Sequence, residues 1–304
     1  MLLPLITSMR LRTLPLSLAG VVCGGFLAYD SSSSSVWTLV FLFLTTVSLQ
    51  ILSNLSNELG DHISGVDSEG REGPNYSMAS GGLTVRQMWC AVNVMVVVCV
   101  LFGLLMIFSS FQDPFTDYRF SFMTLKTTIF KPEVLVLMLL GAAAIWAATH
   151  YTLGGNPYGY RGLGDLFVFI FFGLVSVLGS YYVVAHTIPF SFRVIAPAVG
   201  IGLLSVAVLN VNNIRDMASD EGIRRTIPLR IGLRRARIYQ VALIFVGWGF
   251  MYAGALSWWM LLTALPFDLH IYLVLSRTGK RLDPALPLLV ISTFLTSIAY
   301  LFLS

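Results

Sequence analysis

The chain has 304 residues, of which 56% are hydrophobic and only 11% are charged, and its mean hydropathy is +0.80. Soluble globular chains carry about 25% charged residues, so this composition excludes a soluble enzyme, a nucleic-acid-binding domain and a disordered chain. The 19 Lys and Arg exceed the 15 Asp and Glu by a net charge of +4, which is typical of basic cytoplasmic loops in a membrane protein. The three cysteines lie in apolar stretches, and we interpret them as buried hydrophobic side chains.

Nine apolar stretches approach the length that a bilayer-crossing helix requires. Such a helix needs roughly 20 mostly apolar residues. The sequence therefore predicts a single all-α, polytopic membrane domain over residues 1–304. Its transmembrane helices are expected at about 13–29, 36–56, 89–108, 133–152, 165–186, 193–213, 238–256, 258–276 and 285–303.

The sequence leaves two of these boundaries open. The first span follows Arg10 and Arg12, and Pro15 interrupts it. No small-residue cleavage site clearly follows, so we interpret it as a retained span and not as a signal peptide. Residues 238–276 also fit one long hairpin whose turn lies near 254–257.

The distribution of basic residues predicts the orientation. With a cytoplasmic N-terminus and nine crossings, fifteen of the 19 Lys and Arg lie on the cytoplasmic side. The other four, Arg119, Lys126, Lys131 and Arg193, lie outside. This asymmetry is typical of integral membrane proteins, because basic loops are retained in the cytoplasm.

Two polar motifs follow the second and the sixth predicted spans. The first comprises Asn54, Asn57, Asp61, Asp67 and Arg71, and the second comprises Asn212, Asn213, Arg215, Asp216, Asp220, Arg224 and Arg225. Each contains Asn-x-x-x-Asp at the end of an apolar helix, from Asn57 to Asp61 and from Asn212 to Asp216. The motifs lie four spans apart and on the same predicted side, which indicates an internal repeat of four helices with the ninth helix left over.

The spacing of these motifs favours a magnesium site. Residues four apart share one helical face, so each set can direct its oxygens toward one point. Mg²⁺ prefers oxygen ligands and is often held by carboxylates together with substrate phosphates. The arginines after each motif, Arg71, Arg224 and Arg225, can bind further phosphate oxygens. The alternative is that these acids are helix caps and solvated loop residues, and that the basic run to Arg237 contacts anionic lipid headgroups.

These motifs resemble the UbiA superfamily of intramembrane aromatic prenyltransferases, and within it the MenA type, which prenylates 1,4-dihydroxy-2-naphthoate. The similarity covers residues 10–15, 54–67, 160–173, 179–182 and 212–226, including Gly-Leu-Gly-Asp-Leu-Phe-Val-Phe at 162–169 and Asn-Asn-Ile-Arg-Asp at 212–216. Two positions depart from the family pattern. Glu58 stands where the family usually has Asp, and Arg224, after an extra residue, stands where it usually has Lys.

The resemblance implies a bundle of about nine helices around a lipid-open cavity, with the aspartates at its cytoplasmic end. It implies Mg²⁺ bound by Asp61, Asp67, Asp216 and Asp220, with Asn57 as a further ligand, and these four aspartates as the catalytic residues. The implied substrate-binding residues are Asn54, Asn57, Asn212, Asn213, Arg71, Arg215, Arg224, Arg225 and Asp165.

The resemblance also implies a reaction and a location. A polyprenyl group would pass from polyprenyl diphosphate to dihydroxynaphthoate with loss of CO₂ and diphosphate, giving demethylmenaquinone at the bacterial inner membrane. A superfamily member with another acceptor, such as 4-hydroxybenzoate, homogentisate or haem, is the first alternative. A secondary transporter is the second, although transporter acids lie at the bilayer midplane, whereas these acids gather at one predicted membrane face.

Aromatic and intramembrane ionisable residues give further candidates. An allylic cation needs dry, aromatic walls, and we consider Tyr151, Tyr181 and Tyr182 as cavity residues against the alternative of packing or interface positions. Asp268 and His270 lie inside the eighth predicted span, where ionisable groups are costly and often functional.

Overall fold

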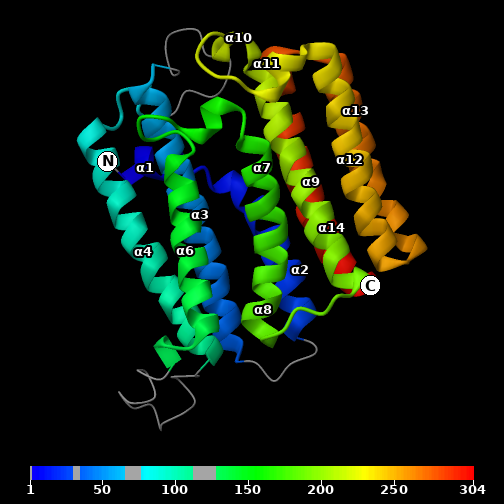
Figure 1. Ribbon diagram of the computed structural model, residues 1–304. Coiled ribbons are helices and arrows are strands. Elements are labelled where there is room, and N and C mark those ends of the chain that lie inside the picture. Colours follow the sequence, from blue (N-terminus) through cyan, green and yellow to red (C-terminus); the bar gives the residue numbers. More distant parts are fainter. Residues whose placement is uncertain (1, 30–34, 66–76, 112–127) are drawn as a thin grey trace.

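The structure of the protein is a computed structural model that describes residues 2–29, 35–65, 77–111 and 128–304. Every regular element in these ranges is a helix (Figure 1). Nine helical segments in them are long and apolar enough to cross a membrane, which confirms the all-α, polytopic architecture. They are Leu2–Tyr29, Val36–Ile63, Val85–Phe111, Pro132–His150, Gly164–Ala185, Phe192–Arg215, Leu233–Ala255, Trp258–Ser276 and Gly279–Leu303.

Several spans are composed of more than one helical element. The elements of the first five spans are α1 (Leu2–Ser8), η1 (Leu11–Thr13), α2 (Leu14–Tyr29), α3 (Val36–Ile63), α4 (Val85–Phe111), α6 (Pro132–His150), α7 (Gly164–Val168), η3 (Phe169–Gly179) and α8 (Ser180–Ala185). The short helix η2 (Tyr158–Arg161) precedes α7. The remaining elements are α9 (Phe192–Arg215), α10 (Met217–Asp220), α11 (Ile227–Ile231), α12 (Leu233–Ala255), η4 (Trp258–Ala264), α13 (Leu265–Ser276), η5 (Gly279–Leu282) and α14 (Ala285–Leu303).

The first span differs from its prediction. Helix begins at Leu2, ahead of Arg10 and Arg12, and the break lies at Arg10, whose φ of 49° is left-handed. Pro15 does not interrupt the span, because it is the second residue of α2. Proline is tolerated in the first turn of a helix, where its missing N–H has no partner to lose.

The seventh and eighth spans form the hairpin that the sequence allows. Helix α12 ends at Ala255, and Leu256 reverses the chain with a φ of 52°. The next span starts with the 3-10 helix η4 and continues as α13. The turn therefore lies within the predicted interval 254–257.

Close helix packing depends on glycine at two contacts of the fifth span. A Cβ atom at Gly24 of α2 would overlap the carbonyl oxygen of Val177, and one at Gly173 would lie 2.5 Å from the carbonyl oxygen of Ala198 in α9. The segment η3, a π-helix whose hydrogen bonds join residues five apart, therefore packs between α2 and α9 with its backbone almost in contact with theirs. Its apolar neighbours include Ala19, Cys23 and Ile201, which form a core cluster with Val177.

The bundle brings the described residues of the two polar motifs to one end. Helices α3, α4 and α6 lie on one side of α2, and α9, α12 and α13 lie on the other (Figure 1). The end of α3 and the segment α10 to α11 are at the same end of the bundle (Figure 1). The division into two four-helix repeats and a ninth helix stays a prediction.

His270 belongs to a buried polar network. Its ring nitrogens contact Gln240 Nε2 at 3.0 Å and the carbonyl oxygen of Ala285 at 2.8 Å. Gln240 Oε1 accepts a hydrogen bond from Asn210 Nδ2 at 2.7 Å. Asp268 is exposed. The network links α9, α12, α13 and α14, so its geometry is that of helix packing.

Candidate active site

We call α3, α4 and α6 on one side of α2, and α9, α12 and α13 on the other, the two halves of the bundle (Figure 1). A buried cluster of charge lies where they meet. Asp61 is in the last turn of α3, Asp220 ends α10, and Arg224 follows in the next loop. Their exposed fractions are 3%, 2% and 9%. Arg224 Nη2 donates to Asp61 Oδ1, and Arg224 Nε lies 3.6 Å from Asp220 Oδ1. One guanidinium thus contacts carboxylates from both predicted motifs.

Tyr160 completes this cluster. Its hydroxyl donates to Asp61 Oδ1 at 2.9 Å and lies 2.8 Å from Ser64 Oγ. Its ring faces the guanidinium of Arg224 at 4.8 Å, a cation–π distance. Sequence reasoning missed Tyr160 as a site residue. The signal was its place directly before the Arg-Gly-Leu-Gly-Asp stretch, but nothing in the spacing indicates that this loop reaches α3.

Close backbone contacts hold the loop that carries Tyr160. The Arg225 N–H donates to the Tyr160 carbonyl oxygen at 2.9 Å. Gly162 has a φ of 79°, and a Cβ there would lie 2.5 Å from the Arg225 carbonyl oxygen. On the other side, a Cβ at Gly60 would lie 2.5 Å from Thr152 Oγ1. Glycine is therefore required on both faces of this loop.

Asp216 has a different partner. Arg215 binds it with two hydrogen bonds of 2.7 Å, from Nε to Oδ1 and from Nη2 to Oδ2. Arg215 also donates to Asn212 Oδ1 at 2.9 Å and to Asp283 Oδ1 at 3.2 Å. Both Asp216 and Arg215 are buried, at 2% and 4% exposure. The guanidinium thus joins the end of α9 to the loop before α14.

The predicted asparagines hold helices in place. Asn54 Nδ2 donates to the carbonyl oxygen of Met9 at 2.9 Å and to Thr13 Oγ1 at 3.0 Å, which ties α3 to the first span. Asn57 Oδ1 accepts from Thr152 Oγ1 at 3.4 Å. Asn213 is buried in α9. Their predicted roles toward substrate or metal stay predictions.

Glu58 acts in the fold. It is fully buried, and its Oε1 accepts the backbone N–H of Met78 at 2.9 Å. The bond ties α3 to the segment before α4. The side chain of Glu58 is one methylene longer than that of Asp, and it reaches from α3 to the backbone N–H of Met78.

The other predicted substrate residues occupy separate places. Tyr151 lies near the cluster, within the electrostatic reach of Arg224 and Asp61. Asp165 is the second residue of α7 and accepts a hydrogen bond from the Tyr239 hydroxyl at 3.0 Å. Arg225 is exposed beside Arg224. Tyr181 lies in an apolar cluster with Leu39 and Val194, away from the carboxylates. Asp67 and Arg71 lie outside the described residues.

The electrostatics favour a charged guanidinium and neutral phenols. Burial opposes the charge of Arg224, but Asp61 and then Asp220 raise the pKa of Arg224 above its ordinary value. Burial, followed by the negative charge of Asp61, raises the pKa of Tyr160 to about 12. Burial likewise raises the pKa of Tyr151 to about 12. Near neutral pH both tyrosines therefore keep a proton to donate.

The oxygen atoms of this cluster fit a magnesium ion that is shared with a substrate. Within the described part of the chain, no three His, Cys, Asp or Glu side chains lie close enough to form a metal site. Asp61 and Asp220 nevertheless converge on one cation, Arg224. One or two carboxylates plus phosphate oxygens and water are the usual ligands of Mg²⁺, so the pair suits a metal that bridges to a diphosphate.

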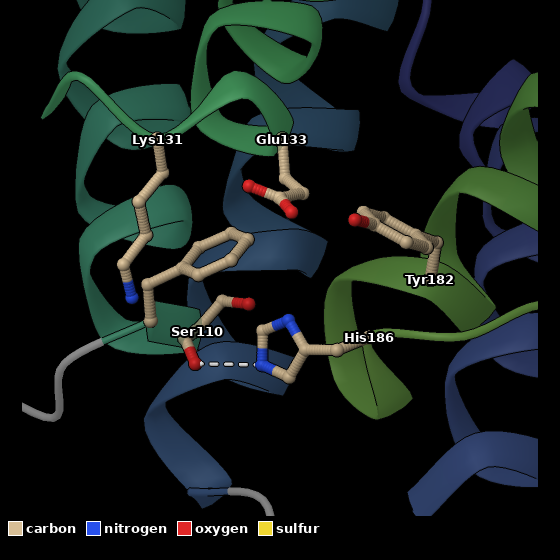
Figure 2. Close-up of a pocket in the computed structure, with 6 residues that line it drawn as sticks. Ser110, Lys131, Glu133, Tyr182 and His186 are labelled. Carbon is tan, nitrogen blue, oxygen red and sulfur yellow. Dashed lines mark hydrogen bonds between the residues drawn. The ribbon is translucent and has the colours of Figure 1, made fainter. Parts of the chain in front are cut away.

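A cavity lies at the opposite end of the bundle from this cluster. It is an open cavity of about 510 Å³ lined by Ser110, Phe111, Lys131, Glu133, Tyr182 and His186. Figure 2 shows Glu133 and Tyr182 pointing toward one another and the His186 ring directed toward Ser110, with His186 Nε2 3.0 Å from the Ser110 carbonyl oxygen. Of the predicted cavity residues it contains Tyr182, which therefore lies at the opposite end of the bundle from Asp61 and Asp220.

The fold and the charged cluster define a polytopic helical membrane protein with a candidate anion and metal site at one end. The comparisons make this class specific: the model of the UbiA prenyltransferase family matches residues 121–300, and the chain belongs to this family. It is 34% identical over 302 residues to the 1,4-dihydroxy-2-naphthoate octaprenyltransferase of Haemophilus influenzae, covering 96% of this chain and 92% of that protein. The Escherichia coli protein of the same name is 38% identical over 239 residues, covering 78% and 71%.

Solved structures show the same fold. A UbiA homologue from Aeropyrum pernix K1, in its apo form, matches with a TM-score of 0.66 and 15% identity, covering 96% of this chain and 98% of that one. A UbiA homologue from Archaeoglobus fulgidus bound to GPP and Mg²⁺ matches with a TM-score of 0.58 and 15% identity, covering 98% and 99%. These likenesses confirm the predicted bundle.

Proposed function

We propose that the protein transfers a polyprenyl group from polyprenyl diphosphate to 1,4-dihydroxy-2-naphthoate, with loss of CO₂ and diphosphate, giving the hydroquinone form of demethylmenaquinone, which a separate two-electron oxidation converts to the quinone. The observation that carries this proposal is the buried Asp61–Arg224–Asp220 cluster in a chain similar along nearly its whole length to naphthoate octaprenyltransferases. A diphosphate needs cations at its oxygens, and the cluster combines a guanidinium with carboxylates that suit Mg²⁺.

The residues of the cluster have separate tasks in this reaction. Asp61 and Asp220 would hold Mg²⁺, whereas Asp216 is bound by Arg215 in this structure, so its role as a further ligand, like that of Asp67, stays a prediction. When bound, Mg²⁺ neutralises the diphosphate and makes it a better leaving group. Arg224 and Arg225 bind phosphate oxygens, for which the planar guanidinium is well matched. Tyr160, with its proton retained, holds the Asp61 carboxylate in one orientation.

The reaction breaks the bond between the allylic carbon and the diphosphate oxygen and forms a carbon–carbon bond to the electron-rich ring. Positive charge develops on the allylic carbon, so the surrounding walls must exclude water. Tyr151 contacts the ring of Tyr158 edge to face, with centroids 5.4 Å apart, and Tyr158 stacks on Phe167 at 4.0 Å. These aromatic faces, close to the cluster, suit that charge.

A direct assay tests the proposal. The purified protein in lipid nanodiscs is given dihydroxynaphthoate, a polyprenyl diphosphate and Mg²⁺, and products are identified by mass spectrometry. Prenylated, decarboxylated product that disappears with EDTA and returns with Mg²⁺ is expected. Product from 4-hydroxybenzoate but not from dihydroxynaphthoate would show that 4-hydroxybenzoate is the acceptor. No product from either would overturn the proposal.

The proposed location is the bacterial inner membrane, with the N-terminus and the candidate active site on the cytoplasmic side. The support is the excess of Lys and Arg in the loops at that end. With nine crossings, the C-terminus lies outside the cytoplasm. An alkaline phosphatase fusion at Ser304 is therefore expected to be active, and an inactive phosphatase with a fluorescent GFP fusion at the same site would reverse the orientation.

A further inference from the structure

Arg224 occupies the place that the proposed function gives to a metal ion. Asp61 and Asp220 come from segments 159 positions apart in the sequence, yet both contact this one side chain. Both carboxylates are almost fully buried. Two buried negative charges are costly unless cations compensate them, and Arg224 is a cation that contacts both.

A metal ion and Arg224 compete for the same oxygen atoms. Asp61 Oδ1 accepts from Arg224 Nη2, and Asp220 Oδ1 faces Arg224 Nε. A divalent cation bound to these carboxylates would lie against the guanidinium of Arg224, and a guanidinium stays charged in proteins. A metal ion and a guanidinium that contact the same carboxylate oxygens are like charges at close range, and they repel strongly in a buried site. Metal binding therefore requires the guanidinium to leave.

The backbone of Arg224 is anchored independently of its side chain. Its backbone N–H donates to the Asp220 carbonyl oxygen at 3.0 Å, and the next N–H, of Arg225, donates to Tyr160. Tyr160 keeps its own bond to Asp61 when the guanidinium departs. A diphosphate gives the displaced guanidinium a new anionic partner, since guanidinium binds phosphate oxygens in a bidentate manner.

We propose that Arg224 is an internal counter-cation that makes metal binding dependent on diphosphate. Without diphosphate, Arg224 occupies Asp61 and Asp220, and a divalent metal binds weakly. With diphosphate, Arg224 transfers from the carboxylates to the phosphate oxygens, and the metal takes its place. This inference rests on the proposed function, because it assumes that the cluster binds a metal–diphosphate complex.

The experiment measures Mn²⁺ binding by electron paramagnetic resonance, with and without inorganic pyrophosphate, in nanodiscs. For the wild type, pyrophosphate is expected to tighten Mn²⁺ binding at least about tenfold, within the usual range of coupling between two sites. In Arg224→Gln, Mn²⁺ alone is expected to bind at least about tenfold more tightly than in the wild type, and the pyrophosphate effect is expected to disappear. Unchanged or weaker Mn²⁺ binding in this variant would overturn the proposal.

Two further variants keep the test decisive. Arg234→Gln removes an exposed arginine from the first turn of α12 at the same end of the bundle, and it should leave Mn²⁺ binding unchanged. Arg224→Lys keeps the charge, but one ammonium cannot reproduce contacts made through two guanidinium nitrogens. It should bind Mn²⁺ with intermediate affinity, and it replaces the glutamine variant if that variant does not fold; affinity equal to the wild type would again overturn the proposal.

Failure of this inference and failure of the proposed function give different results. Suppose that the wild type forms prenylated product but the Arg224 variants bind Mn²⁺ no more tightly than the wild type does. Arg224 then does not compete with the metal for Asp61 and Asp220, and only the inference is wrong. If the wild type binds neither Mn²⁺ nor pyrophosphate and forms no product, the proposed function is wrong, and the inference is lost with it.

Discussion

The two Asn-x-x-x-Asp sets are alike in sequence and unlike in their ion pairs. Asp61 shares its carboxylate with Arg224, which is 163 positions further along the chain and belongs to the other half of the bundle. Asp216 is bound by its neighbour Arg215, which also contacts Asp283. One pair therefore joins the halves, whereas the other fixes the end of α9 within its own half.

The residue before each aspartate explains this difference. Arg215 precedes Asp216, so a guanidinium is available locally. Gly60 precedes Asp61, and the loop at Thr152 approaches so closely that no side chain fits there. Asp61 must therefore take its cation from elsewhere, and the same close approach brings the loop that carries Tyr160. Equal spacing places two carboxylates alike, but the neighbouring residue decides which cation each one meets.

The largest expected effect comes from removing the carboxylate charges. Asp61→Asn and Asp216→Asn should each lower kcat/KM at least about 100-fold, because both groups are proposed to hold the cation at the leaving group. Steady-state assays in nanodiscs measure this. If the Asp216 variant stays fully active while the Asp61 variant loses activity, only the Asp61–Arg224 pair takes part in the reaction.

A smaller effect tests the close approach at Gly60. Gly60→Ala places a methyl group 2.5 Å from Thr152 Oγ1 and should destabilise the protein by about 1–3 kcal/mol. Gly103→Ala is the matched control, because nothing lies within 4 Å of the added carbon in α4, and alanine favours a helix. Thermal unfolding compares the two variants. Equal stability would mean that this loop moves away without cost.

Tyr160→Phe removes one hydrogen bond to Asp61 while keeping the aromatic ring. We expect a loss of stability of about 1 kcal/mol and a decrease of roughly tenfold in affinity for the metal–diphosphate complex, as for other groups that orient metal ligands. Titration of Mn²⁺ in the presence of pyrophosphate measures the affinity, and thermal unfolding measures the stability. Tyr252→Phe on α12, whose ring stacks on Trp248, is the control. Equal binding in both variants would show that the phenol does not orient Asp61.

The smallest effect is expected at the outer partner of Arg215. The side chain of Asp283 is 46% exposed and lies 3.2 Å from Arg215 Nη1. Asp283→Asn should therefore change stability by less than about 1 kcal/mol, as is typical of a partly solvated ion pair. Denaturation followed by tryptophan fluorescence is the measurement. A loss several times larger would show that Arg215 depends on both acids and not mainly on Asp216.

The sequence was sufficient for features set by local composition and periodicity. The spans follow from runs of apolar residues, and the turn near Leu256 from the gap between two of them. Contacts between distant segments could not be derived in this way. Nothing local indicates that Tyr160 reaches Asp61, or that Arg224 turns inward to carboxylates. The helical start at Leu2 was missed because Arg10 and Arg12 resemble a boundary, whereas a left-handed residue at Arg10 lets the chain bend and continue.

The widened turns of η3 affect how the fifth span tolerates changes in length. Hydrogen bonds between residues five apart place more residues in a given length of helix than the α-helical spacing does. Deletion of one residue within Phe169–Gly179 can therefore be absorbed when the segment tightens into an ordinary helix. The same deletion in α9 would turn Asp216 by about 100° away from its present direction. Over evolution, the fifth span can therefore change length while the carboxylates stay in register.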